Sequence, residues 1–134
     1  MQFLIETDIL RSFLTHSDAS RPSVLRRCLS AGVCYTTMVN AMELFQEATT
    51  VGERDAAMHI LSAVRVLGFN ARYAEPFATL ATEHPHLSER EVLVAGMASV
   101  SKLTIVTERY YESYNRNGKP GAVRAPEEVP EGAE

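Results

Sequence analysis

Short, almost wholly apolar runs separated by segments with helical spacing constrain the fold of this chain more than any other feature. Three such runs are Phe3-Leu4-Ile5, "VCYT" at 33–36 and "LTIVT" at 103–107. A strand that is apolar on both sides has to be covered on both sides, which is typical of parallel sheets flanked by helices. We therefore expect an α/β protein, with a three-layer α/β/α sandwich around a short parallel sheet.

The segments between these runs repeat apolar residues at the spacing of amphipathic helices. The expected helices are one that follows the first run and fades near Thr15, one from Pro22 to Gly32, one from about Asn40, one from Glu53 to Leu67, one that bends or begins late at Pro76, and one from Glu89 to Ser101. The small residues Ala95 and Gly96 indicate that the last of these helices packs closely against a neighbour. Residues 1–117 are long enough to form one domain without disulfides. The acidic, Gly/Pro-bearing segment 118–134 is expected to be disordered.

Composition excludes some classes of protein and leaves others open. No apolar run approaches the roughly 18–20 residues of a membrane span, and no secretory signal begins the chain, so we expect a cytoplasmic protein without a membrane partner. Cys28 and Cys34 lack metal-binding spacing and are interpreted as buried apolar residues. The net charge is −4, but four glutamates lie in the last ten residues, "APEEVPEGAE". The remaining body is balanced in charge, which neither indicates nor excludes nucleic acid as a partner.

Carboxylates recur where strands end or helices begin. Glu6 and Asp8 follow the first strand, Glu43 lies in "NAMEL", Glu91 in "SERE", and Glu108 and Glu112 follow the last strand. In open parallel sheets the ligand site lies beyond the carboxyl ends of the strands, so these side chains could converge there. Converging carboxylates repel one another unless a cation neutralises them, and Mg²⁺ or Mn²⁺ accepts such oxygen ligands.

Each acid also has a purely structural explanation. "NAME", with Asn40 at the cap and Glu43 three residues later, is a capping-box pattern, and so is "SERE" from Ser88 to Glu91. Either Glu6 or Asp8 could cap the helix that follows it. Glu112 has the pattern of a solvated helix residue. The pattern alone leaves the capping and ligand-binding interpretations open.

The order of three segments, "FLIETDIL", "TTMVNAMELFQEA" and "REVLVAGMASVSKLTIVTERYYESY", resembles the PIN-domain family over residues 2–114, and within it the VapC-type toxin ribonucleases. The resemblance implies a PIN-like fold and Mg²⁺- or Mn²⁺-dependent cleavage of RNA in a toxin–antitoxin system. It further implies a homodimer, and an antitoxin protein that inserts a helix and often a basic residue near the acids.

The resemblance also assigns roles to individual residues. It implies catalytic roles for Glu6, Glu43, Glu91 and Glu112, and metal binding by Glu6, Asp8, Glu43 and Glu91. Glu6 and Glu91 stand where the family has Asp, and the longer side chain carries the carboxylate about 1.5 Å further, against a tolerance of ~0.5 Å for a productive site.

Arg109 departs further from the family, because it stands where the family commonly has Asn or Asp. Directed inward, its permanent charge would form an ion pair with the acids. Alternatively, it could hold the scissile phosphate of a substrate as an electrostatic clamp.

Two functions therefore stay open. One is a metal-dependent endoribonuclease of toxin type, and the other is a PIN fold that has lost its catalytic set and serves as a nucleic-acid-binding or protein-interaction module. A receiver-type phosphoacceptor domain would need an Asp that ends a middle strand and a Lys after the last strand, and neither is present.

Overall fold

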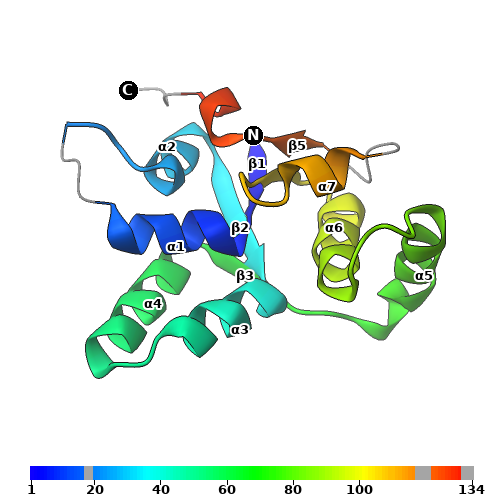
Figure 1. Cartoon of the computed structure of the whole chain (residues 1–134), viewed down its shortest axis with the longest axis horizontal. Helices are drawn as coiled ribbons and strands as arrows, with labels where there is room; N and C mark the ends of the chain where they lie inside the picture. Colours follow the sequence, from blue (N-terminus) through cyan, green and yellow to red (C-terminus); the bar gives the residue numbers. More distant parts are fainter. Residues whose placement is uncertain (17–19, 117–121, 131–134) are drawn as a thin grey trace.

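The computed structural model describes residues 1–16, 20–116 and 122–130. Its centre is a five-stranded sheet of order β3-β2-β1-β4-β5 in which every pair of neighbours is parallel (Figure 1). The strands are β1 (Gln2–Ile5), β2 (Val33–Thr37), β3 (Arg65–Leu67), β4 (Thr104–Val106) and β5 (Val123–Arg124). The predicted α/β class with a short parallel sheet is confirmed.

Helices cover both faces of the sheet. In Figure 1, α1, α2 and α4 lie on one side of the strands, and α5, α6 and α7 lie on the other. The helices are α1 (Thr7–Thr15), α2 (Val24–Ala31), α3 (Met38–Glu47), α4 (Val51–Ala63), α5 (Ala74–Glu83), α6 (Glu89–Ser101) and α7 (Tyr111–Asn115). Two short 3₁₀ helices complete the described part of the chain, η1 (Ala71–Tyr73) and η2 (Pro126–Glu128).

Strand β1 separates two apolar cores. Phe3 and Ile5 pack with residues of α1, α2 and α4, whereas Leu4 packs with residues of α5 and α6, and all three side chains are fully buried. This alternation follows from the two-residue period of a strand. The close packing expected of α6 is present, because a Cβ atom on Gly96 would lie 2.7 Å from the Phe77 ring of α5. Cys28 and Cys34 are free and buried, as predicted.

Several helix boundaries differ from the sequence-based expectations. The helix expected over 53–67 ends at Ala63, and its last apolar residues form the edge strand β3 instead. Helix α3 begins at Met38, and its capping box joins Thr37 to Asn40. The proposed box with Asn40 at the cap is therefore wrong, because Asn40 is the residue at the inner end of the box.

The expectation of disorder from residue 118 onward does not hold for residues 122–130. Strand β5 pairs with β4, and the side chains of Val123 and Val129 are buried. Arg27 also donates a hydrogen bond to the carbonyl oxygen of Pro126, at 3.0 Å. The apolar residues of this segment are separated by Gly, Pro and Glu. The composition of the segment therefore gave no indication of a strand. The remainder of 118–134 lies outside the described residues.

None of the helices in the described ranges combines the length and apolar character that crossing a bilayer requires.

Candidate functional site

The parallel register brings three chain segments to one edge of the sheet. Ile5 is paired with Val106, and the Glu6 amide donates to the Val106 carbonyl oxygen at 3.2 Å. On the other side of β1, the Thr36 hydroxyl donates to the Ile5 carbonyl oxygen at 2.8 Å. The residues that follow β1, β2 and β4 therefore meet at the carboxyl edge, as the sequence analysis expects.

Glu6 lies at the centre of this edge and is fully buried. Its Oε1 atom accepts hydrogen bonds from the Thr7 amide at 3.2 Å and from Asn40 Nδ2 at 2.8 Å. Its Oε2 atom accepts a 2.5 Å hydrogen bond from the hydroxyl of Tyr114. The capping interaction with Thr37 orients Asn40, so the start of α3 directs this donor. The carboxylate is thus held by three donors before any cation is considered.

The cation at this site is Arg90, in the first turn of α6. Its Nη1 and Nη2 atoms donate to the two Glu6 oxygens at 2.9 and 2.7 Å. Its Nε and Nη2 atoms donate to the two Glu43 oxygens at 3.0 and 2.7 Å. The guanidinium carbon lies 4.2 Å from the centre of the Tyr110 ring. We call the side chains of Glu6, Thr7, Asn40, Glu43, Arg90 and Tyr114 the Arg90 cluster.

A chain of hydrogen bonds connects the two acids of the Arg90 cluster. Asn40 Nδ2 donates to the Thr7 hydroxyl at 2.9 Å, and this hydroxyl donates to Glu43 Oε1 at 2.5 Å. The side chains differ in exposure, with 0% for Glu6, 20% for Arg90 and 26% for Glu43. The cluster is therefore closed at Glu6 and reaches solvent only at its Arg90 and Glu43 side.

The surroundings of Glu43 and Arg90 favour the charged forms of these two side chains. Burial acts to raise the pKa of Glu43, but hydrogen bonds from Arg90 and Thr7 outweigh it and hold this pKa below its ordinary value. Burial acts to lower the pKa of Arg90, and the hydrogen bonds to Glu6 and Glu43 raise it instead. Burial and the negative charge of Glu6 raise the pKa of Tyr114, so its hydroxyl stays a donor.

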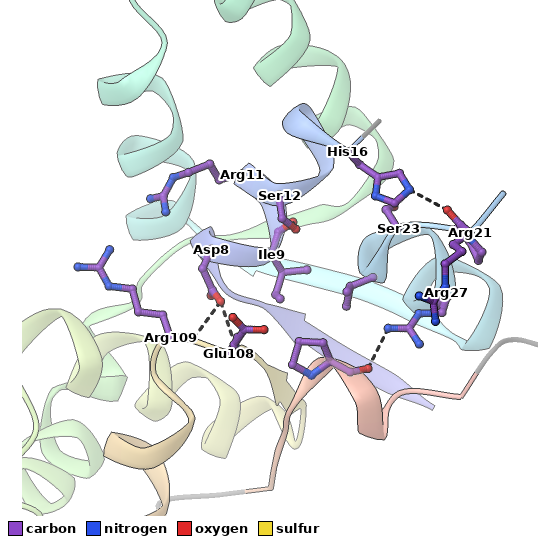
Figure 2. Close-up of a pocket in the computed structure, with 13 residues that line it drawn as sticks. Asp8, Ile9, Arg11, Ser12, His16, Arg21, Ser23, Arg27, Glu108 and Arg109 are labelled. Atoms are coloured by element: carbon purple, nitrogen blue, oxygen red, sulfur yellow. Dashed lines mark hydrogen bonds between the residues drawn. The ribbon is translucent and has the colours of Figure 1, made fainter. Parts of the chain in front are cut away.

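Asp8 has a different environment, although only one residue, Thr7, separates it from Glu6. Its Oδ1 atom accepts from the Thr107 hydroxyl at 2.9 Å, and its Oδ2 atom accepts from the amides of Glu108 and Arg109 at 2.9 and 3.1 Å. Figure 2 shows the hydrogen bonds that Asp8 accepts from the loop that carries Glu108 and Arg109. Asp8 therefore fixes the turn between β4 and α7.

Glu91 is occupied in a capping box, one of the two alternatives that the sequence left open. Its Oε1 atom accepts from the Ser88 amide at 2.9 Å, while the Ser88 hydroxyl accepts from the Glu91 amide at 3.2 Å. Burial opposes ionisation here, but hydrogen bonds with Ser113 and Ser88 and the charge of Arg90 lower the pKa of Glu91. Its carboxylate therefore caps the N-terminus of α6.

Glu112 and Arg109 lie outside the Arg90 cluster. Glu112 is exposed on α7 and, with Glu108, Glu127 and Glu128, borders a surface hollow. Arg109 is exposed as well, and its guanidinium carbon lies 5.4 Å from the centre of the Tyr110 ring. The inward cation that the sequence analysis considered for Arg109 is therefore Arg90, which contacts the same Tyr110 ring.

A divalent metal, which the family resemblance implies, does not fit the residues present. Within residues 1–16, 20–116 and 122–130, no three His, Cys, Asp or Glu side chains gather as a possible metal site. Glu6 and Glu43 do converge, but the N–H groups of Arg90 occupy the carboxylate oxygens that a metal would need. Arg90 cannot neutralise itself by losing a proton. Asp8 and Glu91 are committed to backbone amides.

Sequence reasoning found the two acids of the cluster and missed their partners. The signal for Arg90 was its position: the first turn of a helix favours anions, so a cation there needs a nearby negative partner. Tyr114 carried no comparable signal, because it belongs to a helix of only five residues.

A larger hollow, of about 620 Å³, lies next to the cluster between α1, the start of α2 and the Asp8 turn. It is lined by several cationic side chains, and Figure 2 shows that Arg11 and Arg109 extend to one side of it and Arg27 to the other. Arg11 is bound to Glu47 of α3 at 2.5 and 2.6 Å, and Arg27 donates to Pro126. The hollow is therefore mixed in charge, with Asp8 and Glu108 on its wall.

This geometry can be compared with known proteins. A chain in the VapBC2 complex of Rickettsia felis, bound to a promoter DNA fragment, superposes with a TM-score of 0.76 at 16% identity, over 93% of this chain and 98% of that one. For VapBC-1 of nontypeable Haemophilus influenzae the TM-score is 0.75 at 13% identity, over 96% and 100%. For the FitAcB structure of Neisseria gonorrhoeae it is 0.72 at 17% identity, over 96% and 100%.

The fold is PIN-like and matches chains of these VapBC and FitAcB structures. The sequence matches no protein-family model and no curated protein. At these identities the likeness concerns the fold alone, and the Arg90 cluster has to be interpreted from its own chemistry.

Proposed function

We propose that this chain is a PIN-like protein of toxin–antitoxin type that acts by binding a partner protein and not by metal-dependent hydrolysis of RNA. The occupation of the Glu6 and Glu43 carboxylates by Arg90 carries this proposal. It corresponds to the second hypothesis of the sequence analysis, the PIN fold without a working catalytic set.

The argument against hydrolysis is one of competing ligands. Mg²⁺ and Mn²⁺ need oxygen atoms with free lone pairs. Either ion would also be a second cation at a site that already holds the guanidinium of Arg90. In the Arg90 cluster the Glu6 carboxylate accepts five hydrogen bonds, from Thr7, Asn40, Tyr114 and twice from Arg90. A metal ion would have to displace a guanidinium that makes four charge-assisted hydrogen bonds, which are stronger than neutral ones.

A surface suited to a protein partner supports the binding role. A hollow of about 390 Å³ lies between α1, the end of α3 and α4, and the charged side chains of Arg11, Glu47 and Glu53 are among the residues that line it. Its apolar lining consists of Leu14, Leu44, Ala48 and Ala56. A hollow lined by both apolar and charged side chains is suited to one face of an amphipathic helix. We infer an antitoxin-type partner that presents such a helix, in keeping with solved neighbours that are toxin–antitoxin complexes.

The absence of metal-dependent hydrolysis can be tested directly. Purified wild-type protein and a Glu43→Gln variant are incubated with a panel of single-stranded and structured RNAs in Mn²⁺, in Mg²⁺ and in EDTA. We expect the same RNA pattern for both proteins in all three conditions. Cleavage by the wild type that needs metal and disappears in Glu43→Gln would overturn the proposal.

The binding role has its own test. Amphipathic helical peptides displayed on phage are selected against the wild-type chain. We expect the selected peptides to lose affinity for Leu14→Asp, which places a charge in the hollow, and to keep it for Met58→Asp. Met58 is a suitable control because it is 61% exposed on α4 and does not line the hollow. Selection that yields no peptide sensitive to Leu14→Asp counts against this surface.

A metal-dependent endoribonuclease is the second candidate, favoured by the convergence of Glu6 and Glu43 at the carboxyl edge of the sheet. Under this candidate Arg90 leaves the carboxylates before RNA binds, and Arg109, exposed beside Asp8, holds a phosphate of the RNA. The RNA assay above separates the two candidates.

A further inference from the structure

The contacts of Arg90 have the features of a binding site for a guanidinium group. Its Nε, Nη1 and Nη2 atoms all donate, at 2.7 to 3.0 Å, to four oxygens that belong to two glutamates. The guanidinium carbon is 4.2 Å from the centre of the Tyr110 ring. Two carboxylates that match the planar fork and an aromatic ring beside it are the contacts that guanidinium groups prefer.

We propose that Glu6, Glu43 and Tyr110 form a guanidinium-selective site, and that Arg90 is the ligand which the chain itself supplies to it. The inference deepens the proposed function and rests on it, since the same carboxylates are concerned. It adds the chemical class of cation that the pocket accepts, which the proposed function leaves undefined.

Selectivity follows from the directions in which the carboxylates are already engaged. Thr7 and Tyr114 donate to opposite oxygens of Glu6, and Thr7 also donates to Glu43. Asn40 donates to Glu6 as well, so Arg90 adds its bonds to a Glu6 carboxylate that already accepts three, and it contacts both oxygens of Glu43. An ammonium group is a compact point charge and cannot reach four oxygens in this arrangement, whereas a planar guanidinium can.

The charge of the cluster supplies the driving force. One guanidinium between two carboxylates leaves an excess of one negative charge, and Glu6 has no exposed surface through which water could stabilise it. Without Arg90, the pocket would hold two facing carboxylates, which repel each other in a site of low dielectric. A small planar cation from solution can then take the vacated place.

The test removes the ligand that the chain supplies and offers it from solution. The melting temperature of Arg90→Ala is measured with millimolar methylguanidinium, methylammonium or Mn²⁺, each as the chloride salt at equal ionic strength. We expect methylguanidinium to raise the melting temperature by several degrees and methylammonium to have little effect. Guanidinium salts denature proteins at molar concentrations, so stabilisation in the millimolar range has to come from binding.

Two controls locate the effect. Wild-type protein, whose pocket is filled, and Arg11→Ala, which loses a guanidinium from the exposed pair with Glu47, should both show no response to methylguanidinium. The inference is overturned if Arg90→Ala does not respond to methylguanidinium, whether or not it responds to Mn²⁺. It is also overturned if Arg11→Ala responds equally.

A second variant keeps the inference testable if Arg90→Ala does not fold. Arg90→Lys retains the charge and loses the planar fork, so its melting temperature should fall far more than that of Arg11→Lys. Equal, small changes in both lysine variants contradict a guanidinium-selective site. These outcomes are separate from the fate of the proposed function, which fails only if the wild type cleaves RNA in a metal-dependent way or its α1–α4 hollow binds no helix.

Discussion

Two arginines of this molecule bind glutamates with the same chemistry and in opposite environments. Arg11 of α1 makes a bidentate pair with Glu47 of α3, and the two side chains are 37% and 48% exposed. Arg90 of α6 binds Glu6 and Glu43 at a place where Glu6 has no exposed surface. Both contacts join segments that are far apart in sequence. Burial, and not the presence of a short ion pair, therefore decides how much each contact contributes to stability.

The physical reason is the cost of removing charges from water. For the exposed pair this cost is small and the attraction is screened, so the net contribution is small. For the buried cluster the cost is large, and the attraction and hydrogen bonds have to offset it. The buried cluster therefore adds little net stability relative to an apolar core, but the loss of one partner leaves a buried charge unpaired.

The largest effect is expected when this partner is lost. Arg90→Met keeps the length of the side chain and removes its charge, which should reduce the free energy of unfolding by about 3–5 kcal/mol. Arg11→Met should reduce it by less than about 1 kcal/mol. Urea unfolding of both variants at neutral pH measures the difference. Losses of equal size would mean that the Arg90 cluster is solvated to the same degree as the surface pair.

A double variant identifies the source of this loss. If the unpaired charge of Glu6 is responsible, adding Glu6→Gln to Arg90→Met should cost much less than the sum of the single substitutions. A coupling of roughly 0.5–3 kcal/mol is the usual range for groups in one hydrogen-bond network. Simple additivity would show that Arg90 and Glu6 contribute independently.

Tyr114→Phe is expected to have the next largest effect. It removes the hydroxyl that donates to Glu6 and leaves the fully buried ring in place. A hydrogen bond to a charged group contributes about 1.5–3 kcal/mol, so the free energy of unfolding should fall by that amount. Tyr35→Phe is the matched control, because within the described part of the chain the Tyr35 hydroxyl makes no hydrogen bond. An equal loss in both variants would mean that the hydrogen bond from Tyr114 to Glu6 does not contribute to stability.

A smaller effect is expected from the titration of Glu43, which is partly exposed. The pKa of Glu43 is lowered in the folded protein, mainly by its hydrogen bonds with Arg90 and Thr7 against the opposing effect of burial. Its contribution to stability is therefore present above the ordinary pKa of about 4.5 and is lost as the pH falls through the lower folded value.

Urea unfolding of wild type and Glu43→Gln between pH 3 and pH 7 would measure this contribution. The difference in stability between the two proteins should shrink as the pH falls below about 4.5, the ordinary value for this carboxyl. A difference that stays constant across this range would show that the charge of Glu43 makes no contribution.

The fold and the cluster differ in how far the sequence predicted them. The central strands and the helices around Leu25 and Met97 were predicted because their apolar periodicity is long and unbroken. The strands β3 and β5 were missed because they are two or three residues long at the edges of the sheet, where half-exposed positions give no pattern. In the absence of periodicity, only tertiary pairing defines such strands.

The same limit applies to the cluster. Glu6 and Glu43 were predicted as neighbours because the carboxyl ends of parallel strands meet at one edge. Whether a metal ion or a side chain would neutralise them depends on the direction that a helix gives to its first-turn residues. Only the packing of α6 against the sheet sets that direction. The sequence analysis therefore considered Arg109 as the cation that pairs with the acids, whereas in the structure this cation is Arg90.

The smallest effect is expected from salt. Salt tests the difference between the exposed Arg11–Glu47 pair and the Arg90 cluster without any substitution in the cluster of the wild type. The contribution of the Arg11–Glu47 pair is the difference in unfolding free energy between wild type and Arg11→Ala, at most about 1 kcal/mol at low salt. Because both side chains are exposed, raising the ionic strength to 1 M, where the screening length is about 3 Å, should remove most of this difference. The corresponding difference for Arg90→Met should change little, since Glu6 is out of contact with the solvent ions. If salt reduced both differences by the same fraction, ions would have access to the Arg90 cluster, and the proposal that Arg90 keeps Mn²⁺ away from Glu6 would lose its support.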